Sequence, residues 1–135
     1  HGFGDGPELL AIEKAKTWLT ESKLLEDGKL HRIFGFNNPD PSPGSPNYGY
    51  DVWITVEDDV DPGSEGKLIS FDGGLYAVTR CGGVDAIGPT WQKFVEWREK
   101  SPYRYAPDHQ WLEEFLNWNS AIDQLTFDLY MPVRK

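Results

Sequence analysis

The sequence predicts a single α+β domain built from two copies of one strand–helix–strand–strand unit. Three observations lead to this fold class. Two segments, one in each half of the chain, carry apolar residues at helical spacing. Alternating side-chain types from Tyr48 to Val56 indicate a strand with two different faces. The two halves also resemble each other in sequence. A chain of 135 residues is long enough to bury the core of one such domain.

The first predicted helix runs from Glu8 to Leu25, where apolar residues recur at helical spacing. Pro7 suits the first turn of this helix, and Gly28 lies beyond its end. These flanking residues place a helix at the start of the chain.

Two strands and a long loop are expected next. A strand begins at Ile33 and ends at Asn37, where an Asn-Asn-Pro sequence follows. The residues from there to Gly49 include four prolines, which block both helix and ladder, so we expect a loop. Tyr48 to Val56 is the two-faced strand. The acidic stretch from Glu57 to Gly66 is expected to be a solvated turn.

The second half predicts another helix between strands. Lys67 to Cys81 is expected to form strands that break at Gly73-Gly74. A helix marked by Ile87 and Trp91 ends near Ser101. The last expected elements are a short helix capped by Asp108 and continuing to Leu116, and a strand from Leu125 to Val133.

Two pairs of segments carry the internal resemblance. Tyr50 to Val56 matches Phe127 to Val133 in residue type at an offset of 127 − 50 = 77. Trp18 to Ser22 resembles Trp97 to Ser101 at an offset of 97 − 18 = 79. We therefore expect a pseudo-two-fold axis that relates repeat one, residues 1–60, to repeat two, residues 61–135. Trp53 and Tyr130 correspond to each other, and we expect them to line the same central feature.

The repeats differ at their first strand. Repeat two has a strand, Leu75 to Cys81, before its helix, and His1 to Gly4 resembles Arg80 to Gly83 at an offset of 79. We expect the matching first strand of repeat one to be absent from this sequence and to lie ahead of His1.

The composition excludes several classes of function. Asp and Glu number 22 against 13 Lys and Arg, a net charge of −9, and no basic stripe is present. Direct nucleic-acid binding is therefore not expected. Cys81 is the only cysteine, which excludes a disulfide or a Cys-based zinc site within one chain. No apolar run is long enough to cross a bilayer, and we expect a cytoplasmic protein.

The sequence also lacks motifs for a metal or a cofactor. Its three histidines lie far apart, and the pair His109 and Glu113, at i and i+4, offers too few ligands for zinc. No P-loop, glycine-rich dinucleotide fingerprint or nucleophile elbow occurs. We predict no metal and no cofactor.

Several motifs together resemble the GyrI-like small-molecule-binding domain, which also serves as the effector-binding domain of AraC- and MerR-type transcription regulators. Gly74 to Val78 is followed by Gly82-Gly83 and then by Trp91 and Trp97 on one helix. Leu112 to Leu116 resembles the acidic-aromatic motif of that family, and Asp128 to Val133 resembles its last strand. The resemblance covers the chain apart from the first strand.

The resemblance implies two βαββ units that form a curved antiparallel sheet with two long helices. It also implies a cleft along the pseudo-two-fold axis that binds hydrophobic, often cationic compounds. Glu113 aligns with the glutamate that meets the positive charge, and Tyr130 aligns with an aromatic residue that contacts the ligand. Phe115 stands where a tyrosine is common, and Trp53 stands where the family often has a smaller residue.

We predict a ligand site in this central aromatic cleft. The predicted site residues are Glu113, Trp53, Tyr130, Trp91, Trp111, Tyr48, Tyr76 and Phe36. Other interpretations of these residues stay open. Glu113 has an equivalent neighbour in Glu114, and without the family resemblance the sequence favours an exposed helix carboxylate at this position. Trp53 and Tyr130 read equally well as cross-strand core packing, and the remaining aromatic residues as core.

Three functions are compatible with the sequence. The first is a small-molecule sensor or sequestering protein, either alone or as the effector domain of a regulator whose DNA-binding part lies elsewhere, with a homodimer as one form. The second is a hydrolase of cyclopropane-containing genotoxins in which Glu113 activates water. The third is a protein-interaction module that acts on a topoisomerase.

Overall fold

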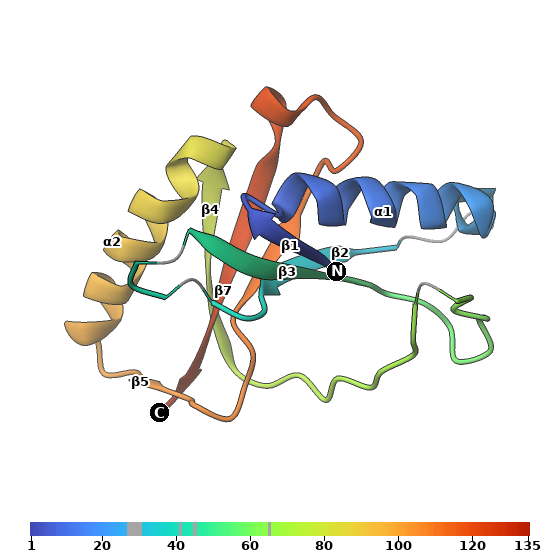
Figure 1. The fold of residues 1–135 in the computed structure, drawn as a ribbon. Helices are drawn as coiled ribbons and strands as arrows, with labels where there is room; N and C mark the ends of the chain where they lie inside the picture. Colours follow the sequence, from blue (N-terminus) through green and yellow to red (C-terminus); the bar gives the residue numbers. More distant parts are fainter. Residues whose placement is uncertain (27–30, 41, 45, 65) are drawn as a thin grey trace.

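The computed structural model describes residues 1–26, 31–40, 42–44, 46–64 and 66–135. These residues form two α-helices and a seven-stranded antiparallel sheet, so the predicted α+β class is confirmed (Figure 1). The helices are α1 (Glu8–Glu21) and α2 (Ile87–Glu99). The strands are β1 (Gly2–Asp5), β2 (Ile33–Asn37), β3 (Asn47–Ile54), β4 (Tyr76–Gly82), β5 (Arg104–Tyr105), β6 (Leu112–Phe115) and β7 (Thr126–Arg134).

The strand order of the sheet is β1-β3-β2-β6-β7-β4, and β5 pairs with the end of β7. β2 and β6 meet at the centre, where Gly35 lies opposite Glu113. The order is the same from either edge inward. In both β1-β3-β2 and β4-β7-β6 the strand before the helix lies at the edge, the last strand of that half lies next to it, and the remaining strand lies at the centre of the sheet. The duplication stays a prediction, and this order supports it.

The register agrees with the offsets found in the sequence. Gly2 pairs with Tyr50 in one half of the sheet, and Cys81 pairs with Phe127 in the other. Since 81 − 2 = 79 and 127 − 50 = 77, each residue of the first pair corresponds to its counterpart in the second by the sequence comparison. A pseudo-two-fold axis would pass between β2 and β6.

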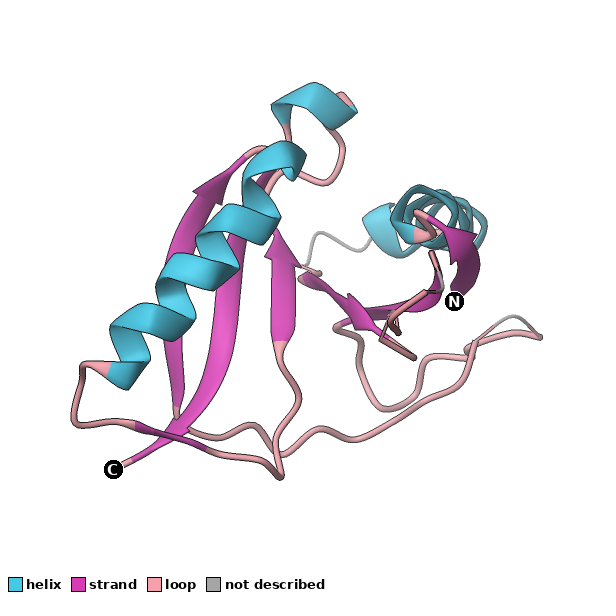
Figure 2. Ribbon diagram, turned by 60° about the vertical axis from the view of Figure 1, so that its left-hand side comes forward, coloured by secondary structure: helices cyan, strands magenta, loops and turns pink. Residues whose placement is uncertain are grey.

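Both helices pack on one face of the sheet, which we call the helix side. Figure 2 shows α2 along one half of the sheet and α1 beside the other half. The two helices and the sheet enclose the core. Its buried side chains include Ala11, Ile12 and Leu19 of α1, Phe94 of α2, Ile33 and Tyr50 of the first half of the sheet, and Phe127, Leu129 and Met131 of β7. Burying each large apolar side chain stabilises the fold by about 1.5–3 kcal/mol.

The other face of the sheet, the open side, has no helix over it among the described residues. The chain between β3 and β4 runs beneath the sheet on this side, away from α1 (Figure 1). Phe71 of this connection contacts Trp53, whose ring lies 5.4 Å away between centroids. Aromatic side chains rather than a helix therefore cover the open side.

The expectation that repeat one lacks its first strand is wrong. β1 precedes α1 and pairs antiparallel with β3 from Gly2↔Tyr50 to Asp5↔Asn47. Gly2 lets this strand lie against the start of α1. A Cβ there would lie 2.8 Å from the carbonyl oxygen of Pro7, so the strand can approach the start of α1 only without a side chain.

The predicted short helix from Asp108 to Leu116 is also wrong, because Leu112–Phe115 form β6. Asp108 does not begin a helix. β6 instead pairs with β2 on one side and with β7 on the other. Ladder hydrogen bonds on both edges outweigh the local capping preference, which is a typical tertiary override of short-range propensity.

Three element boundaries differ from expectation. α1 ends at Glu21 rather than Leu25, since Lys23 adopts a positive φ of 59° and a short 3-10 turn follows. β3 ends at Ile54. Of the stretch from Lys67 to Cys81, only the part within β4 is a strand, and described residues 67–75 form no regular element. No helix among the described residues is long and apolar enough to cross a membrane.

Candidate functional site

Glu113 lies at the centre of the sheet, with Gly35 of β2 on one side and Leu129 of β7 on the other. Its carboxylate is held from the helix side by two neutral donors. The Tyr50 hydroxyl donates to Oε1 over 2.7 Å, and the Trp91 indole Nε1–H donates to Oε2 over 2.8 Å. A strand of each half of the sheet and helix α2 therefore meet at this one carboxylate.

Tyr50 reaches Glu113 because Gly35 leaves space for it. Tyr50 is 1% exposed. A Cβ built on Gly35 would lie only 2.2 Å from the Tyr50 hydroxyl oxygen and 2.4 Å from its ring. Any side chain at residue 35 would occupy the position of the phenol. The absence of a side chain in β2 thus sets the path of the Tyr50 ring to the acid.

Burial dominates the electrostatics of this carboxylate. Desolvation raises the pKa of Glu113 above its usual value, although the bonds from Trp91 and Tyr50 act to lower it. The negative charge of Glu8 raises this pKa further. Burial and the charge of Glu113 also hold the pKa of Tyr50 well above its ordinary range, so its hydroxyl stays protonated and donates. Within the described ranges, Glu113 takes part in no ion pair.

A second carboxylate belongs to the same neighbourhood. Glu8 stands in the first turn of α1 and accepts a hydrogen bond of 2.5 Å from the Tyr48 hydroxyl. Tyr48 and Tyr50 are two residues apart on β3, so both side chains project from the same face of the strand. We call the group of Glu8, Tyr48, Tyr50, Trp91 and Glu113 the helix-side site.

Two further aromatic residues extend this site along α2. The rings of Trp91 and Trp111 lie 5.2 Å apart between centroids, and those of Trp111 and Tyr105 lie 5.3 Å apart. All three side chains are only partly buried. The rings are tilted to one another by 53° and 48°, and their π-faces, which carry partial negative charge, lie near an acid.

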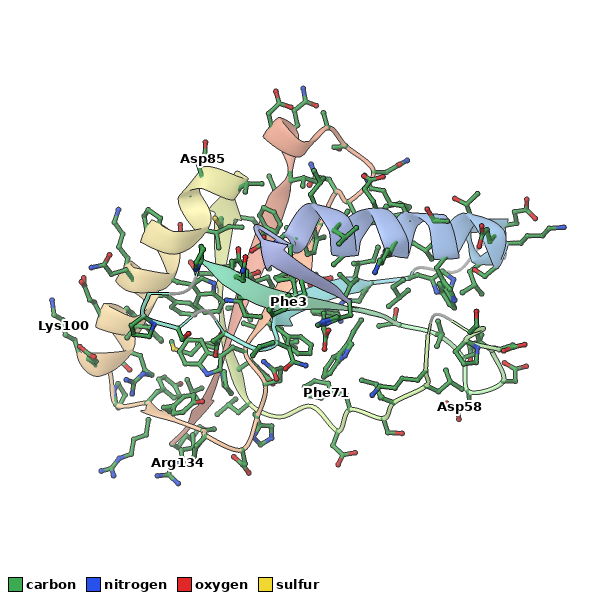
Figure 3. All side chains as sticks on the ribbon, viewed as in Figure 1. Phe3, Asp58, Phe71, Asp85, Lys100 and Arg134 are labelled. Carbon is green, nitrogen blue, oxygen red and sulfur yellow. The ribbon has the colours of Figure 1, made fainter. Side chains whose placement is uncertain are left out.

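A separate row of rings lies on the open side. Trp53 packs edge-on against Phe36 at 4.8 Å and contacts Phe71, which lies on the β3–β4 connection (Figure 3). The row continues through Tyr76, which lies 6.5 Å from Phe71 and 6.0 Å from Tyr130. All of these distances join ring centroids. The contacts are those of side chains packed on one another.

Glu114 belongs to the open side and has a full set of partners. Arg32 binds it through two bonds of 2.9 Å, from Nε and Nη2, and the Tyr130 hydroxyl donates to Oε1 over 2.7 Å. The Arg32 guanidinium also lies 5.0 Å from the ring centroid of Phe34. The bond from Arg32 holds the pKa of Glu114 below its usual value, while burial and Glu114 raise the pKa of Tyr130 to about 12.

The predicted site residues divide between the two faces of the sheet. Glu113, Trp91, Trp111 and Tyr48 meet on the helix side. Trp53, Tyr130, Tyr76 and Phe36 form part of the row on the open side. The sheet separates these two sets, so one cleft does not contain all eight residues. Their roles in ligand binding stay predictions.

The sequence analysis missed two residues of the helix-side site, Tyr50 and Glu8, and also Gly35, over which Tyr50 packs. Tyr50 could have been found, because the Tyr-Gly-Tyr pattern at residues 48–50 puts two tyrosines on one face. Gly35 and Glu8 gave no such signal, since their importance depends on contacts between β3, β2 and α1. The reading of Glu113 as an exposed helix carboxylate is wrong, because it lies on β6 and both of its oxygens accept hydrogen bonds.

Two surface grooves lie away from this site. One of about 470 Å³ runs between α2 and β4 and is lined by Val78, Phe94 and Trp97. The other, of about 530 Å³, lies beside Trp18 and Pro62. Among the described residues, no three His, Cys, Asp or Glu side chains are grouped so that they could hold a metal ion.

Comparison with known protein families shows where the chain belongs. The family model described as "Cass2: Integron-associated effector binding protein" matches residues 9–133. No curated protein matches the chain. The match covers α2, the strands from β2 to β6, all but the first residue of α1 and all but the last residue of β7, and it includes Glu113, Trp91 and Tyr50. The chain therefore belongs to the Cass2 family of integron-associated effector binding proteins, a family of the GyrI-like small-molecule-binding domain.

Proposed function

We propose that the protein binds hydrophobic, cationic small molecules at the helix-side site, with Glu113 as the counter-charge. It would act as a sensor or sequestering protein, or as the effector domain of a transcription regulator. The observation that carries this proposal is the state of Glu113. It is a half-buried carboxylate that is strongly desolvated, with two neutral donors and, in the described part of the chain, no cationic partner.

A buried carboxylate without a cation is costly, because its lost hydration is only partly replaced by hydrogen bonds. A ligand cation beside Glu113 would recover much of that cost. Trp91, which is only partly buried, would contact the same ligand through its ring, and a cation over an aromatic face gains about 0.5–2 kcal/mol. The site therefore favours soft, delocalised cations over strongly hydrated ones such as an alkylammonium.

The proposed pseudo-two-fold axis relates the acid on β6 to the position on β2 that has no side chain. Glu113 and Gly35 pair directly across β2 and β6, and they would be equivalent under the duplication. One copy supplies the acid, and the other supplies the space that Tyr50 fills. The site is thus asymmetric at the centre of a symmetric strand order.

The test is a titration with ethidium, a planar cation, followed by quenching of tryptophan fluorescence. We expect saturable binding to the natural protein and at least a tenfold weaker affinity for Glu113→Gln, which corresponds to about 1.4 kcal/mol. Glu114→Gln is the matched control. It removes the same charge one residue away but on the opposite face, and its affinity for ethidium should stay within about twofold.

Equal affinities for the natural protein and Glu113→Gln, with both proteins folded by circular dichroism, would contradict the proposal. The same variant tests the hydrolase alternative in a turnover assay. The raised pKa of Glu113 favours this alternative, since a general base works best with its pKa near the operating pH. Turnover of a cyclopropane-containing compound that is lost in Glu113→Gln would support that activity. Homodimer formation, action on a topoisomerase and a cytoplasmic location stay predictions.

A further inference from the structure

The helix-side site holds two carboxylates rather than one, and the second of them has no part in the binding proposed above. We propose that Glu8 is a specificity-determining residue that makes the site prefer flat dications to flat monocations. This inference rests on the proposed binding of cations at Glu113.

Strand β3 sets the positions of both acids. The Tyr48 hydroxyl donates a hydrogen bond to Glu8, and the Tyr50 hydroxyl donates one to Glu113. Residues i and i+2 of a strand are about 6.6 Å apart and point to the same face. Two phenols on one face of β3 therefore donate to one carboxylate each, one at the start of α1 and one on the central strand β6. The two acids are close enough for the charge of Glu8 to raise the pKa of Glu113.

The two charges act on each other. Glu8 raises the pKa of Glu113 and that of Tyr50 through its negative charge. Neither glutamate forms an ion pair within the residues that the structure describes. A single cation at Glu113 would leave Glu8 without a counter-charge, whereas a ligand with a second positive centre several Å away would neutralise both.

Glu8 also has an ordinary structural role, because an acid in the first turn of a helix interacts well with the helix dipole. That role explains a glutamate at this position but does not depend on which ligand binds at Glu113. The two roles therefore differ in one measurable property. A helix-stabilising acid changes the stability of the protein, whereas a specificity-determining acid changes the ratio of affinities for dications and monocations.

The experiment compares ethidium with propidium. Both dyes have the same phenanthridinium ring, and propidium carries an additional quaternary ammonium group on a short alkyl chain. Isothermal titration calorimetry at one ionic strength gives both dissociation constants. We expect propidium to bind at least about tenfold more tightly than ethidium to the natural protein. In Glu8→Gln the two affinities should agree within about twofold.

Glu13→Gln is the matched control. Glu13 also lies on α1, its side chain is 61% exposed, and its substitution changes the net charge of the protein by the same amount. It should preserve the preference for propidium. Tyr48→Phe is a second variant that keeps the charge of Glu8 but removes the hydroxyl that orients it, and it should reduce the preference partly.

Each outcome has a defined meaning. Equal affinities for both dyes in the natural protein, with binding lost in Glu113→Gln, would overturn the role of Glu8 but leave the proposed function in place. If Glu8→Gln and Glu13→Gln lose the preference for propidium equally, the preference is a general effect of net charge, and the role of Glu8 is also overturned. Failure of both dyes to bind would overturn the proposed function itself, and this inference with it.

Discussion

The phenol of Tyr50 lies over the backbone of Gly35 at the centre of the sheet. A Cβ on Gly35 would come within 2.2 Å of the Tyr50 hydroxyl oxygen. The same hydroxyl donates to Glu113, which pairs directly with Gly35 across β2 and β6. One glycine therefore controls whether the tyrosine and the acid can meet.

Gly35→Ala should displace Tyr50 and break its bond to Glu113. Inserting a methyl group into a packed core typically costs about 1–3 kcal/mol, and we expect a loss of that size in the free energy of unfolding measured with urea. Ethidium affinity should fall as well, because the acid loses one of its two donors.

The control for this substitution is Gly88→Ala, since a Cβ on Gly88 meets nothing within 4 Å. Gly88 lies in α2, where alanine is the better helix former, so its stability should be unchanged or raised by up to about 1 kcal/mol. A Gly35→Ala protein with natural stability and natural dye affinity would show that Tyr50 has another path to Glu113.

Glu113 and Glu114 should give opposite pH dependences. The pKa of Glu113 is raised in the folded state by burial, so its stabilising contribution is present at low pH and is lost as pH rises through the raised pKa. The pKa of Glu114 is lowered by Arg32, so its contribution is present at neutral pH and is lost as pH falls through the lowered pKa.

Urea unfolding of both glutamine variants from about pH 4 to about pH 7 tests these signs. Relative to the natural protein, the free energy of unfolding of Glu113→Gln should increase as pH rises, because glutamine avoids the desolvated charge. The free energy of unfolding of Glu114→Gln should decrease relative to the natural protein over the same interval, because this variant loses the ion pair. Parallel slopes for the two variants would contradict the opposite pKa shifts of these two acids.

The two aromatic sets can be separated with conservative substitutions. Trp91→Phe keeps a ring but removes the donor to Glu113 Oε2, so ethidium should bind about tenfold less tightly, as expected for a bond to a charged group. Trp53→Phe changes a ring on the open side and should leave the affinity within about twofold. The reverse result, read by calorimetry, would place the ligand on the open side with Trp53 and Tyr130.

Arg32→Gln should destabilise the fold without changing dye binding. It leaves Glu114, whose side chain is 10% exposed, with only the Tyr130 hydroxyl as a partner. Leaving a buried acceptor poorly satisfied costs about 1–3 kcal/mol, which urea unfolding at pH 7 would measure. A large loss of ethidium affinity in this variant would show that the two faces are coupled.

Much of the fold could be predicted from the sequence. Helical spacing located α2 and most of α1, and alternation located β3 and β7. These predictions succeeded because periodicity is a local property that each segment carries by itself. β1 and β6 were missed for the opposite reason. Each is four residues long, and each is held by ladder bonds from strands far away in the sequence.

The sequence by itself determined the fold class, the family resemblance and the presence of an acid near aromatic residues. The resemblance singled out Glu113, and only the tertiary structure decided which face of the sheet each of the two neighbouring acids occupies. Glu113 and Glu114 are adjacent and chemically identical, and successive residues of a strand point to opposite faces. The pairing of β6 with β2 and β7 turned one toward Tyr50 and Trp91 and the other toward Arg32. That choice depends on register, and register is a relationship between strands that no single segment encodes.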